Sequence, residues 1–274
     1  MICSCERLDL LYFKITTMAF KLLTSVKDGF LQLLFPIRCV VCERETENPP
    51  SSKLRRARKN KLICSDCLKN LTPSLNFYCL LCEAKSVDAG MCYSCKTIAG
   101  ENGSFKIDKL IYPFSYREPA IQKIVKAFKY SFIKELTEPI GKLMINYLNK
   151  IGGEFSFNDY LIIPVPLHKR KYNWRGYNQS ELVAQKISKY LNIGLAKNYL
   201  IKEKSTRDQV ELKKDERLKN LDGAFKCSGS ESISGRKILL VDDVYTTGTT
   251  MNECARVLKE AGAKEVIGLA IARG

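Results

Sequence analysis

The hydrophobic pattern changes character near residue 100 of this 274-residue chain. Before that point the apolar positions lack a regular period, whereas beyond it short apolar runs alternate with apolar positions spaced as on one face of a helix. The runs indicate buried strands and the spaced positions indicate packed helices. The pattern predicts strands at 107–115, 160–166 and 238–241, and helices around 121–128, 136–148, 183–191 and 251–261.

Strands that alternate with helices indicate a largely parallel sheet in an α/β fold. In such sheets ligands gather at the carboxyl ends of the strands. Two loops of unusual composition follow predicted strands: Pro164-Val165-Pro166 and the segment that begins at Asp242. We therefore expect the ligand site at these two loops.

The segment from Ile238 to Thr250 is the most informative of the chain. Four apolar residues predict a buried strand that ends at Asp242, and a Thr/Gly loop then leads into the last helix. A helix start offers backbone N–H groups without intrahelical partners, and the helix dipole adds positive potential there. Gly248 lets the backbone approach an anion, and the pair Thr250 and Glu253 predicts a capping box at the helix start.

Two adjacent acids complete this segment. Asp242 and Asp243 are suited to accept hydrogen bonds from neighbouring sugar hydroxyls or to bind Mg²⁺ through water. The implied ligand is a sugar phosphate. A solvated loop and an ATPase Walker B site are the alternatives, but the chain contains no G-x-x-x-x-G-K-[ST] partner for the latter.

Four C-x-x-C pairs precede the change in pattern. A short segment with a small hydrophobic core needs further cross-links to be stable. Thiolates spaced in this way bind structural zinc in a reducing compartment. The pattern predicts two zinc ions, with one ion plus stray thiols, or redox-active pairs, as alternatives. The predicted ligands, paired in sequence order although a crossed order stays open, are Cys39, Cys42, Cys64, Cys67, Cys79, Cys82, Cys92 and Cys95.

The excess of positive charge indicates a polyanionic partner. The formal net charge is +16, and zinc-bound thiolates would remove only part of the excess. Between the first two cysteine pairs lies a run of cations that is suited to the phosphates of single-stranded DNA, with a solvated insertion as the alternative. The predicted nucleic-acid contacts are Lys53, Arg55, Arg56, Arg58, Lys59 and Lys61.

Targeting signals are weak at the start of the chain. Lys21, Lys27 and Asp28 interrupt the apolar residues at 20–35, so we expect no membrane span there, and no secretory signal is evident. A cytoplasmic protein is the expectation. Residues 1–17 have no recognisable role and are interpreted as an extension or a disordered tail, with Met18 as a possible start.

Strand, acid pair and Thr/Gly loop resemble the 5-phosphoribosyl 1-pyrophosphate (PRPP) motif of type I phosphoribosyltransferases. Over residues 18–274 the order of further motifs is similar to the ComF family of competence-associated proteins. These motifs include Leu34-Phe35-Pro36, Lys129-Tyr130, Pro164-Val165-Pro166-Leu167, Arg175-Gly176-Tyr177-Asn178-Gln179, and then Thr206, Gln209, Arg217, Asn220 and Phe225. Tyr245 inside the PRPP loop departs from the family pattern and is expected to narrow the sugar pocket.

The resemblance implies a type I phosphoribosyltransferase fold, a mostly parallel sheet with helices on both faces, behind a cysteine-rich zinc-ribbon module. The expected domains are a module at 18–100 with a leading helix and a phosphoribosyltransferase-like domain at 101–274. It also implies a closing flexible loop at 202–222 that carries Arg207 and Arg217, for each of which a plain surface charge is the alternative. The implied PRPP contacts are Leu167, His168, Asp242, Asp243, Val244, Tyr245, Thr246, Thr247, Gly248, Thr249 and Thr250.

Charge development sets the expected mechanism. Departure of pyrophosphate needs electrostatic clamps and Mg²⁺ more than a nucleophile. The expected catalytic residues are Asp242, Asp243 and Arg175, the last through a charge-assisted contact or, alternatively, as a surface charge. His168 is the only histidine, and no nucleophile motif accompanies it.

Two functions remain open. The family role implies a protein that binds PRPP and acts on or near imported single-stranded DNA in natural transformation, with a competence helicase or DNA-processing proteins as further partners. The alternatives are a nucleobase phosphoribosyltransferase of metabolism and a non-catalytic, PRPP-sensing DNA-binding adaptor. A phosphoribosyltransferase with an unidentified acceptor is the expected enzyme class.

Overall fold

The computed structural model describes residues 37–46, 62–99, 105–204, 223–228 and 230–274. The chain divides into two compact units between Leu68 and Lys69. Of the first unit, residues 37–46 and 62–68 are described, and the second unit runs from Lys69 to the C-terminus. This division does not coincide with the expected domain boundary at residue 100, because the segment that carries Cys79 to Cys95 belongs to the second unit.

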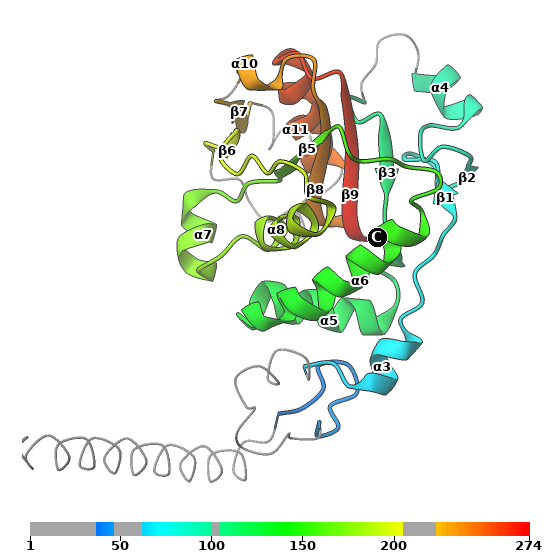
Figure 1. Cartoon of the computed structure of the whole chain (residues 1–274), viewed down its shortest axis with the longest axis vertical. Helices are drawn as coiled ribbons and strands as arrows, with labels where there is room; N and C mark the ends of the chain where they lie inside the picture. The colour runs from blue at the N-terminus through cyan, green and yellow to red at the C-terminus, as the bar shows by residue number, and fades with distance from the viewer. Residues whose placement is uncertain (1–36, 47–61, 100–104, 205–222, 229) are drawn as a thin grey trace, which may run out of the picture. The chain divides into compact units, whose positions relative to one another are not determined.

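The helices and strands of the described residues are short before residue 105 and longer after it (Figure 1). In chain order they are α3 (Ser65–Asn70), β1 (Phe77–Tyr78), β2 (Lys85–Ser86), α4 (Tyr93–Ala99), β3 (Lys109–Ile111), β4 (Phe114–Ser115), α5 (Pro119–Tyr130), the 3-10 helix η3 (Lys134–Leu136), α6 (Thr137–Lys150), β5 (Tyr160–Pro164), α7 (Lys169–Arg175), α8 (Gln179–Leu191), β6 (Leu200–Lys202), β7 (Phe225–Cys227), α10 (Ser230–Ile233), β8 (Lys237–Tyr245), α11 (Thr249–Glu260) and β9 (Glu265–Arg273).

A parallel sheet forms the centre of the second unit. Its strand order is β3-β9-β8-β5, and β4 pairs with the far end of β9. Every pairing within this sheet is parallel, as the alternation of strands and helices predicted. Because β5 and β8 are neighbours, the loops that follow them lie at the same edge of the sheet.

Helices cover both faces of this sheet. On one face Ile238 and Leu240 of β8 pack in a cluster with Met251, Cys254 and Leu258 of α11. Successive strand residues point to opposite faces, so Leu239 and Val241 point to the other side, and α8 packs against β5 and β8. Figure 1 shows α8 in front of the sheet in this view. The hydrophobic spacing of the sequence therefore predicted the buried faces correctly.

Two local predictions need correction. The strand predicted at 107–115 is split into β3 and β4, because Tyr112-Pro113 interrupts it and proline has no N–H for the ladder. The apolar spacing in the helix predicted at 183–191 puts Tyr190 on one face with Val183 and Ile187, yet 49% of its surface is exposed and its hydroxyl bonds with Asn149. Within the described residues, no helix has both the length and the apolar character to cross a membrane.

Candidate functional site

Strand β8 continues through the acid pair instead of ending at it. Pairing with β9 persists at Asp242 and Val244 and reaches Tyr245, which lies opposite Arg273. The polar residues do not end the strand because the β9 backbone still accepts and donates hydrogen bonds there. Both carboxylates are thus fixed on a central strand at the carboxyl edge of the sheet.

The turn after β8 is tight and depends on Gly248. This residue has φ of 75°, in the left-handed region, and an added Cβ would lie 2.2 Å from the Tyr245 hydroxyl oxygen. Glycine is therefore required both by conformation and by space. The hydroxyl oxygens of Thr247 and Thr249 lie 2.9 Å apart across this turn, and Thr246 is exposed.

Helix α11 begins at Thr249 with Gly248 as its N-cap and without a side-chain cap. The predicted capping box is therefore wrong. Glu253 instead forms a two-pronged ion pair with Arg256, with N–O distances of 2.7 and 2.9 Å. The N-terminal N–H groups of this 12-residue helix thus lack a carboxylate cap from Glu253, which is the arrangement expected of a phosphate-binding turn.

Each acid of the pair has a partner from another element. Lys129 Nζ, at the end of α5, lies 2.7 Å from Asp243 Oδ1. Asp242 Oδ1 accepts hydrogen bonds from Ser180 Oγ at 2.9 Å and from the backbone N–H of Asp243 at 2.8 Å. These contacts fix the two carboxylates in defined positions before any ligand binds.

Burial dominates the electrostatics of the pair. The pKa of Asp242 is raised to about 7 by burial and by repulsion from Asp243, against the opposing effects of Lys129 and Ser180. Burial opposes the charge on Lys129, but attraction to Asp243 outweighs it and raises the pKa of the amine. Asp242 thus takes up a proton near neutral pH.

Lys129 and Ser180 were not predicted as site residues. The dipeptide Lys129-Tyr130 matched the family pattern, but a lysine at the end of a helix has no sequence signal for a contact with a strand more than a hundred residues away. Ser180 is the second residue of α8, and its sequence context is that of an ordinary helix start. Their roles follow only from the packing of α5 and α8 around β8.

The Arg175–Gln179 motif forms the frame of this site. Tyr177 and Gln179 both donate to the carbonyl of Phe128, at 2.8 and 3.1 Å, next to Lys129. Asn178 caps α8 by accepting from Ser180 N–H, and its amide donates to the carbonyl of Val165 at 2.9 Å. The motif therefore ties α5, the Pro-Val-Pro loop and α8 together.

Arg175 lies inside this frame. Only 9% of its surface is exposed, and its Nη1 donates to Gln179 Oε1 at 2.8 Å. Its guanidinium lies 5.6 Å from the ring centre of Tyr130 and 6.0 Å from that of Trp174. The surface-charge alternative is therefore wrong, and the expected catalytic contact stays a prediction.

Leu167 and His168 follow β5 as expected, at the carboxyl edge of the sheet. His168 Nδ1 accepts the N–H of Arg170 at 3.2 Å and so caps α7. The side chain thus has a local structural role. Contact of this loop with pyrophosphate stays a prediction.

Tyr245 does not narrow the sugar pocket as expected. Only 3% of the surface of Tyr245 is exposed, and its hydroxyl donates to the carbonyl of Leu80 at 3.3 Å. Arg273 lies 5.4 Å from the ring centre and donates to the carbonyls of Cys79 and Leu80 at 2.8 and 3.1 Å. The back of the turn is therefore bonded to the second cysteine segment.

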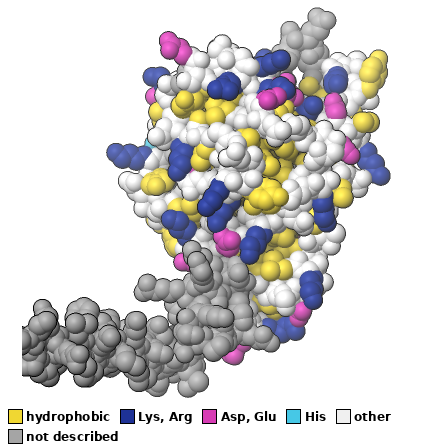
Figure 2. Space-filling view, viewed as in Figure 1, with side chains coloured by type: hydrophobic (Ala, Val, Ile, Leu, Met, Phe, Trp, Pro, Cys, Tyr) yellow, Lys and Arg dark blue, Asp and Glu magenta, His cyan; other side chains and the backbone are white. Residues whose placement is uncertain are grey.

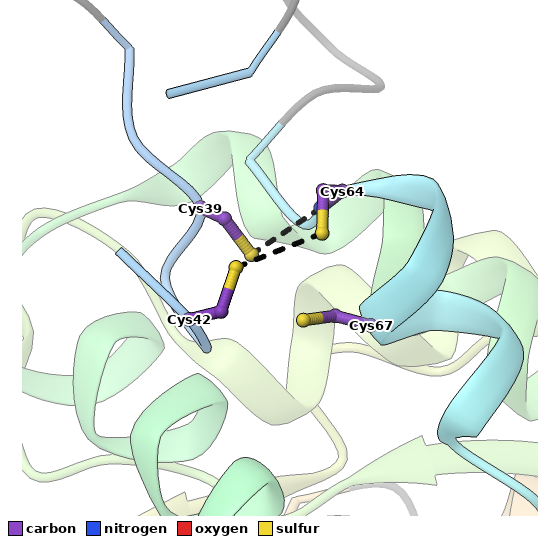
Figure 3. Close-up of side chains that lie close together, drawn as sticks. All are labelled: Cys39, Cys42, Cys64 and Cys67. Carbon is purple, nitrogen blue, oxygen red and sulfur yellow. Dashed lines mark hydrogen bonds between the residues drawn. The ribbon is translucent and has the colours of Figure 1, made fainter. Parts of the chain in front are cut away.

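The eight cysteines gather into two tetrads in sequence order. The sulfur atoms within each tetrad all lie within 4.8 Å of one another. Figure 3 shows the four side chains of the first tetrad pointing toward a common centre, with Cys42 and Cys64 sulfurs 3.8 Å apart. The first tetrad is Cys39, Cys42, Cys64 and Cys67, and the second is Cys79, Cys82, Cys92 and Cys95.

These tetrads have the donor set and spacing of structural zinc sites. A tetrahedral zinc with Zn–S bonds of about 2.3 Å places sulfurs about 3.8 Å apart, and the Cys82 and Cys92 sulfurs are 3.6 Å apart. Backbone N–H groups also point at sulfur: the pKa of Cys42 is lowered to about 6, chiefly by the N–H of Arg44. Both tetrads can hold a zinc ion, whereas Mg²⁺ at the acid pair stays a prediction.

Several predicted residues lie outside the described ranges. These are the flexible-loop residues Arg207 and Arg217, the cationic run with Lys53, Arg55, Arg56, Arg58, Lys59 and Lys61, and the extension at 1–17. The strands that flank the loop segment are described: β6 pairs with β7 in an antiparallel ribbon.

Comparison with known proteins identifies the family. Over 244 residues the chain is 30% identical to competence protein F of Haemophilus influenzae, which covers 87% of this chain and 98% of that protein. The chain belongs to the competence protein F (ComF) family. The family also includes competence protein ComFC of Bacillus subtilis, with 24% identity over 228 residues that span 82% of this chain and 89% of that protein. DNA utilization protein YhgH of Escherichia coli K12 is 30% identical over 151 residues, 54% of this chain and 65% of that protein.

The phosphoribosyl transferase domain family matches residues 178–273 of this ComF chain. The match begins at the α8 cap and includes the acid pair and the Thr/Gly turn. Among solved structures, the purine phosphoribosyltransferase of Pyrococcus horikoshii is 16% identical over 49% of this chain and 82% of that chain, with a TM-score of 0.30. The parallel sheet and the domain match together show the fold of a phosphoribosyltransferase.

Proposed function

We propose that this ComF protein binds PRPP with Mg²⁺ at the turn between β8 and α11 and transfers phosphoribose in the cytoplasm during DNA uptake. The observation that supports it most is the acid pair, held by Lys129 and Ser180, directly before a glycine turn at a helix start. Asp242 and Asp243 would accept the ribose hydroxyls, and the backbone of Thr246 to Thr250 would hold the 5-phosphate.

The electrostatic layout supports departure of pyrophosphate. Negative charge builds on the leaving group, so catalysis requires cations and N–H donors more than a nucleophile. Mg²⁺ with bound PRPP would supply Lewis acidity at the phosphate oxygens. The chain itself supplies Lys129 beside Asp243 and the backbone around Pro166 to Lys169, which follows β5 at the same edge of the sheet.

The competence role rests on the relatives. Three of them are named for competence or DNA utilization, and the chain carries a formal net charge of +16. Figure 2 shows Lys and Arg side chains in excess over acidic ones on the visible face. Such a surface is suited to single-stranded DNA, either as the acceptor or as the molecule near which the enzyme works. Each cysteine tetrad would hold one structural zinc.

Calorimetry with PRPP and Mg²⁺ tests the binding site. Wild type is expected to bind, and Asp243→Asn to bind at least about tenfold more weakly, because the mutation removes one acceptor carboxylate and leaves Lys129 without its partner. Asp159→Asn, at an exposed acid before β5, is the matched control and should bind as wild type does. Equal affinity of wild type and Asp243→Asn would refute the site.

Turnover is tested separately. Release of pyrophosphate from PRPP, measured against nucleobases and single-stranded DNA, distinguishes an enzyme from a PRPP-sensing adaptor. Release that requires DNA favours the competence enzyme, and release with a free base favours the metabolic alternative. Binding of PRPP without release of pyrophosphate in any of these mixtures would favour the non-catalytic adaptor.

A further inference from the structure

Three aromatic side chains form an exposed cluster at the junction of α5 and α7. Tyr130, Phe132 and Trp174 are 48%, 47% and 59% exposed. The Phe132 and Trp174 rings meet edge to face, with their centres 5.1 Å apart. Large aromatic rings normally contribute to stability by burial, so a contiguous exposed cluster indicates an interaction surface.

The backbone at Phe132 supports the same interpretation. This residue has φ of 56°, in the left-handed region, which is unfavourable for a bulky side chain. Burial of the ring does not compensate, because about half of the residue remains exposed. Strain of this kind is typical of functional positions.

Arg175 fixes two rings of the cluster from the protein interior. Its guanidinium lies within 6.0 Å of the ring centres of Tyr130 and Trp174, and Gln179 holds it in place. In the described part of the chain, Arg175 Nε is buried without a hydrogen-bond partner. The rings are thus positioned before any partner binds, which lowers the entropic cost of stacking.

Helix α7, which carries Trp174, is rich in cations. Helix α7 has the sequence KRKYNWR, with four cations and no acid, and Lys169 and Arg170 are exposed. Glu135 of η3 is the exposed acid that follows Phe132 most closely in the chain. Flat rings interleaved with cations favour a partner that has both bases and phosphates. Double-stranded nucleic acid does not fit, because its bases are already stacked inside the duplex.

We propose that Tyr130, Phe132 and Trp174, with the cations of α7, form a stacking surface for single-stranded nucleic acid. Binding to this surface does not require the proposed function, but its biological role rests on that function. Tyr130 directly follows Lys129, which contacts Asp243, so a nucleic-acid strand on this surface lies beside the proposed ribose-phosphate site. Bases stack on the rings, and the phosphates of the strand contact Lys169 and Arg170.

Trp174 is the only tryptophan of the chain, so its fluorescence reports directly on this surface. Addition of a thymidine 20-mer to the full-length protein is expected to quench this emission, and a duplex of the same length to quench it far less. Unchanged emission at saturating single strand, with binding established by anisotropy, would contradict the proposal.

Two variants test the contribution of stacking. Trp174→Ala and Phe132→Ala are each expected to weaken single-strand binding about tenfold, since base stacking contributes about 1–3 kcal/mol per base. Neither variant should alter the salt dependence of binding. Lys169→Ala should reduce the slope of log affinity against log salt concentration by the amount expected for about one phosphate contact. Tyr93→Ala, at an aromatic residue of α4 that is 86% exposed, is the matched control and should bind as wild type does. Wild-type affinity in both Trp174→Ala and Phe132→Ala would overturn the proposal.

PRPP calorimetry on the same variants distinguishes this proposal from the proposed function. Trp174→Ala should retain PRPP binding, because its ring is not among the groups that contact the acid pair. Quenching by single strands in a protein that fails to bind PRPP would remove the proposed function and leave the stacking surface intact. The reverse result would remove the stacking surface alone.

Discussion

The two cysteine tetrads have nearly the same local geometry in different surroundings. In each, the first cysteine donates its N–H to a carbonyl five residues on, at 2.9 Å for Cys39 and 2.7 Å for Cys79. A glutamate with positive φ follows the second cysteine in each, at 63° for Glu43 and 61° for Glu83. The third cysteine of each tetrad directly precedes a short helix, α3 or α4.

Their surroundings give the tetrads different roles. The first tetrad lies in the unit that ends at Leu68, whereas the second belongs to the unit that carries the acid pair. Leu80, inside the second tetrad, is buried in the core cluster together with Tyr245. Arg273 and Tyr245 both donate to the backbone carbonyl of Leu80. The same motif thus stabilises a separate unit in one case and supports the turn after β8 from behind in the other.

Removal of one ligand from each tetrad gives the largest expected contrast. Cys92→Ser should lower the melting temperature of the second unit by about 10 °C or more and weaken PRPP binding more than tenfold. The reason is that the cysteine segment that packs behind Tyr245 would lose its zinc ion. Cys64→Ser should leave PRPP affinity within about twofold of wild type. Zinc content per chain, thermal unfolding and calorimetry check this contrast, and equal effects of the two variants on PRPP affinity would refute it.

Arg273 is the second way to test the comparison. Arg273→Met removes charge-assisted hydrogen bonds to the carbonyls of Cys79 and Leu80 and should cost about 3 kcal/mol of unfolding free energy. It should also weaken PRPP binding, with zinc content unchanged. Denaturant unfolding measures the first effect. Arg256→Met, at a half-exposed arginine paired with Glu253 and Glu260, is the control and should cost less than about 1 kcal/mol.

A pH series gives the smallest and most local effect. The pKa of Asp242 is raised to about 7, so the folded protein holds a proton that the unfolded chain releases near pH 4. Stability from this group is therefore present below about pH 4 and declines as pH rises to about 7. PRPP binding should change in the opposite sense and strengthen several-fold from pH 6 to 8, since the ionised carboxylate is the better acceptor.

Calorimetry across this pH range should show the change in wild type and in Cys64→Ser alike, because the first tetrad lies in the other unit. Asp242→Asn should lose the pH dependence of PRPP affinity that comes from the carboxyl group and keep the pH dependence that comes from titration of the ligand phosphates. A wild-type profile in Asp242→Asn would show that another group titrates.

The sequence was most informative where a local pattern determines the structure. Apolar periodicity predicted β5, the start of β8 and the helices α5, α6, α8 and α11, but not the central strand β9. The spacing of cysteines predicted two tetrads in sequence order. The Asp242-Asp243 pair and Gly248 indicated the turn, because a tight approach to a helix start requires glycine at that position.

Contacts between distant segments were not predictable in this way. Lys129 meets Asp243 only because α5 packs beside the end of β8, and no periodicity encodes that contact. Tyr245 read as a possible obstruction in the sugar pocket, yet pairing with β9 directs its side chain inward to Leu80. Tertiary packing decided which side of the strand each residue occupies.

A crystal structure with PRPP and Mg²⁺ tests the central claim most directly. The account predicts the 5-phosphate at the backbone of Thr246 to Thr250 and the ribose hydroxyls on Asp242 and Asp243, with the contact between Lys129 and Asp243 lengthened or lost. A vacant turn, with both carboxylates still held by Lys129 and Ser180 at saturating ligand, would contradict it.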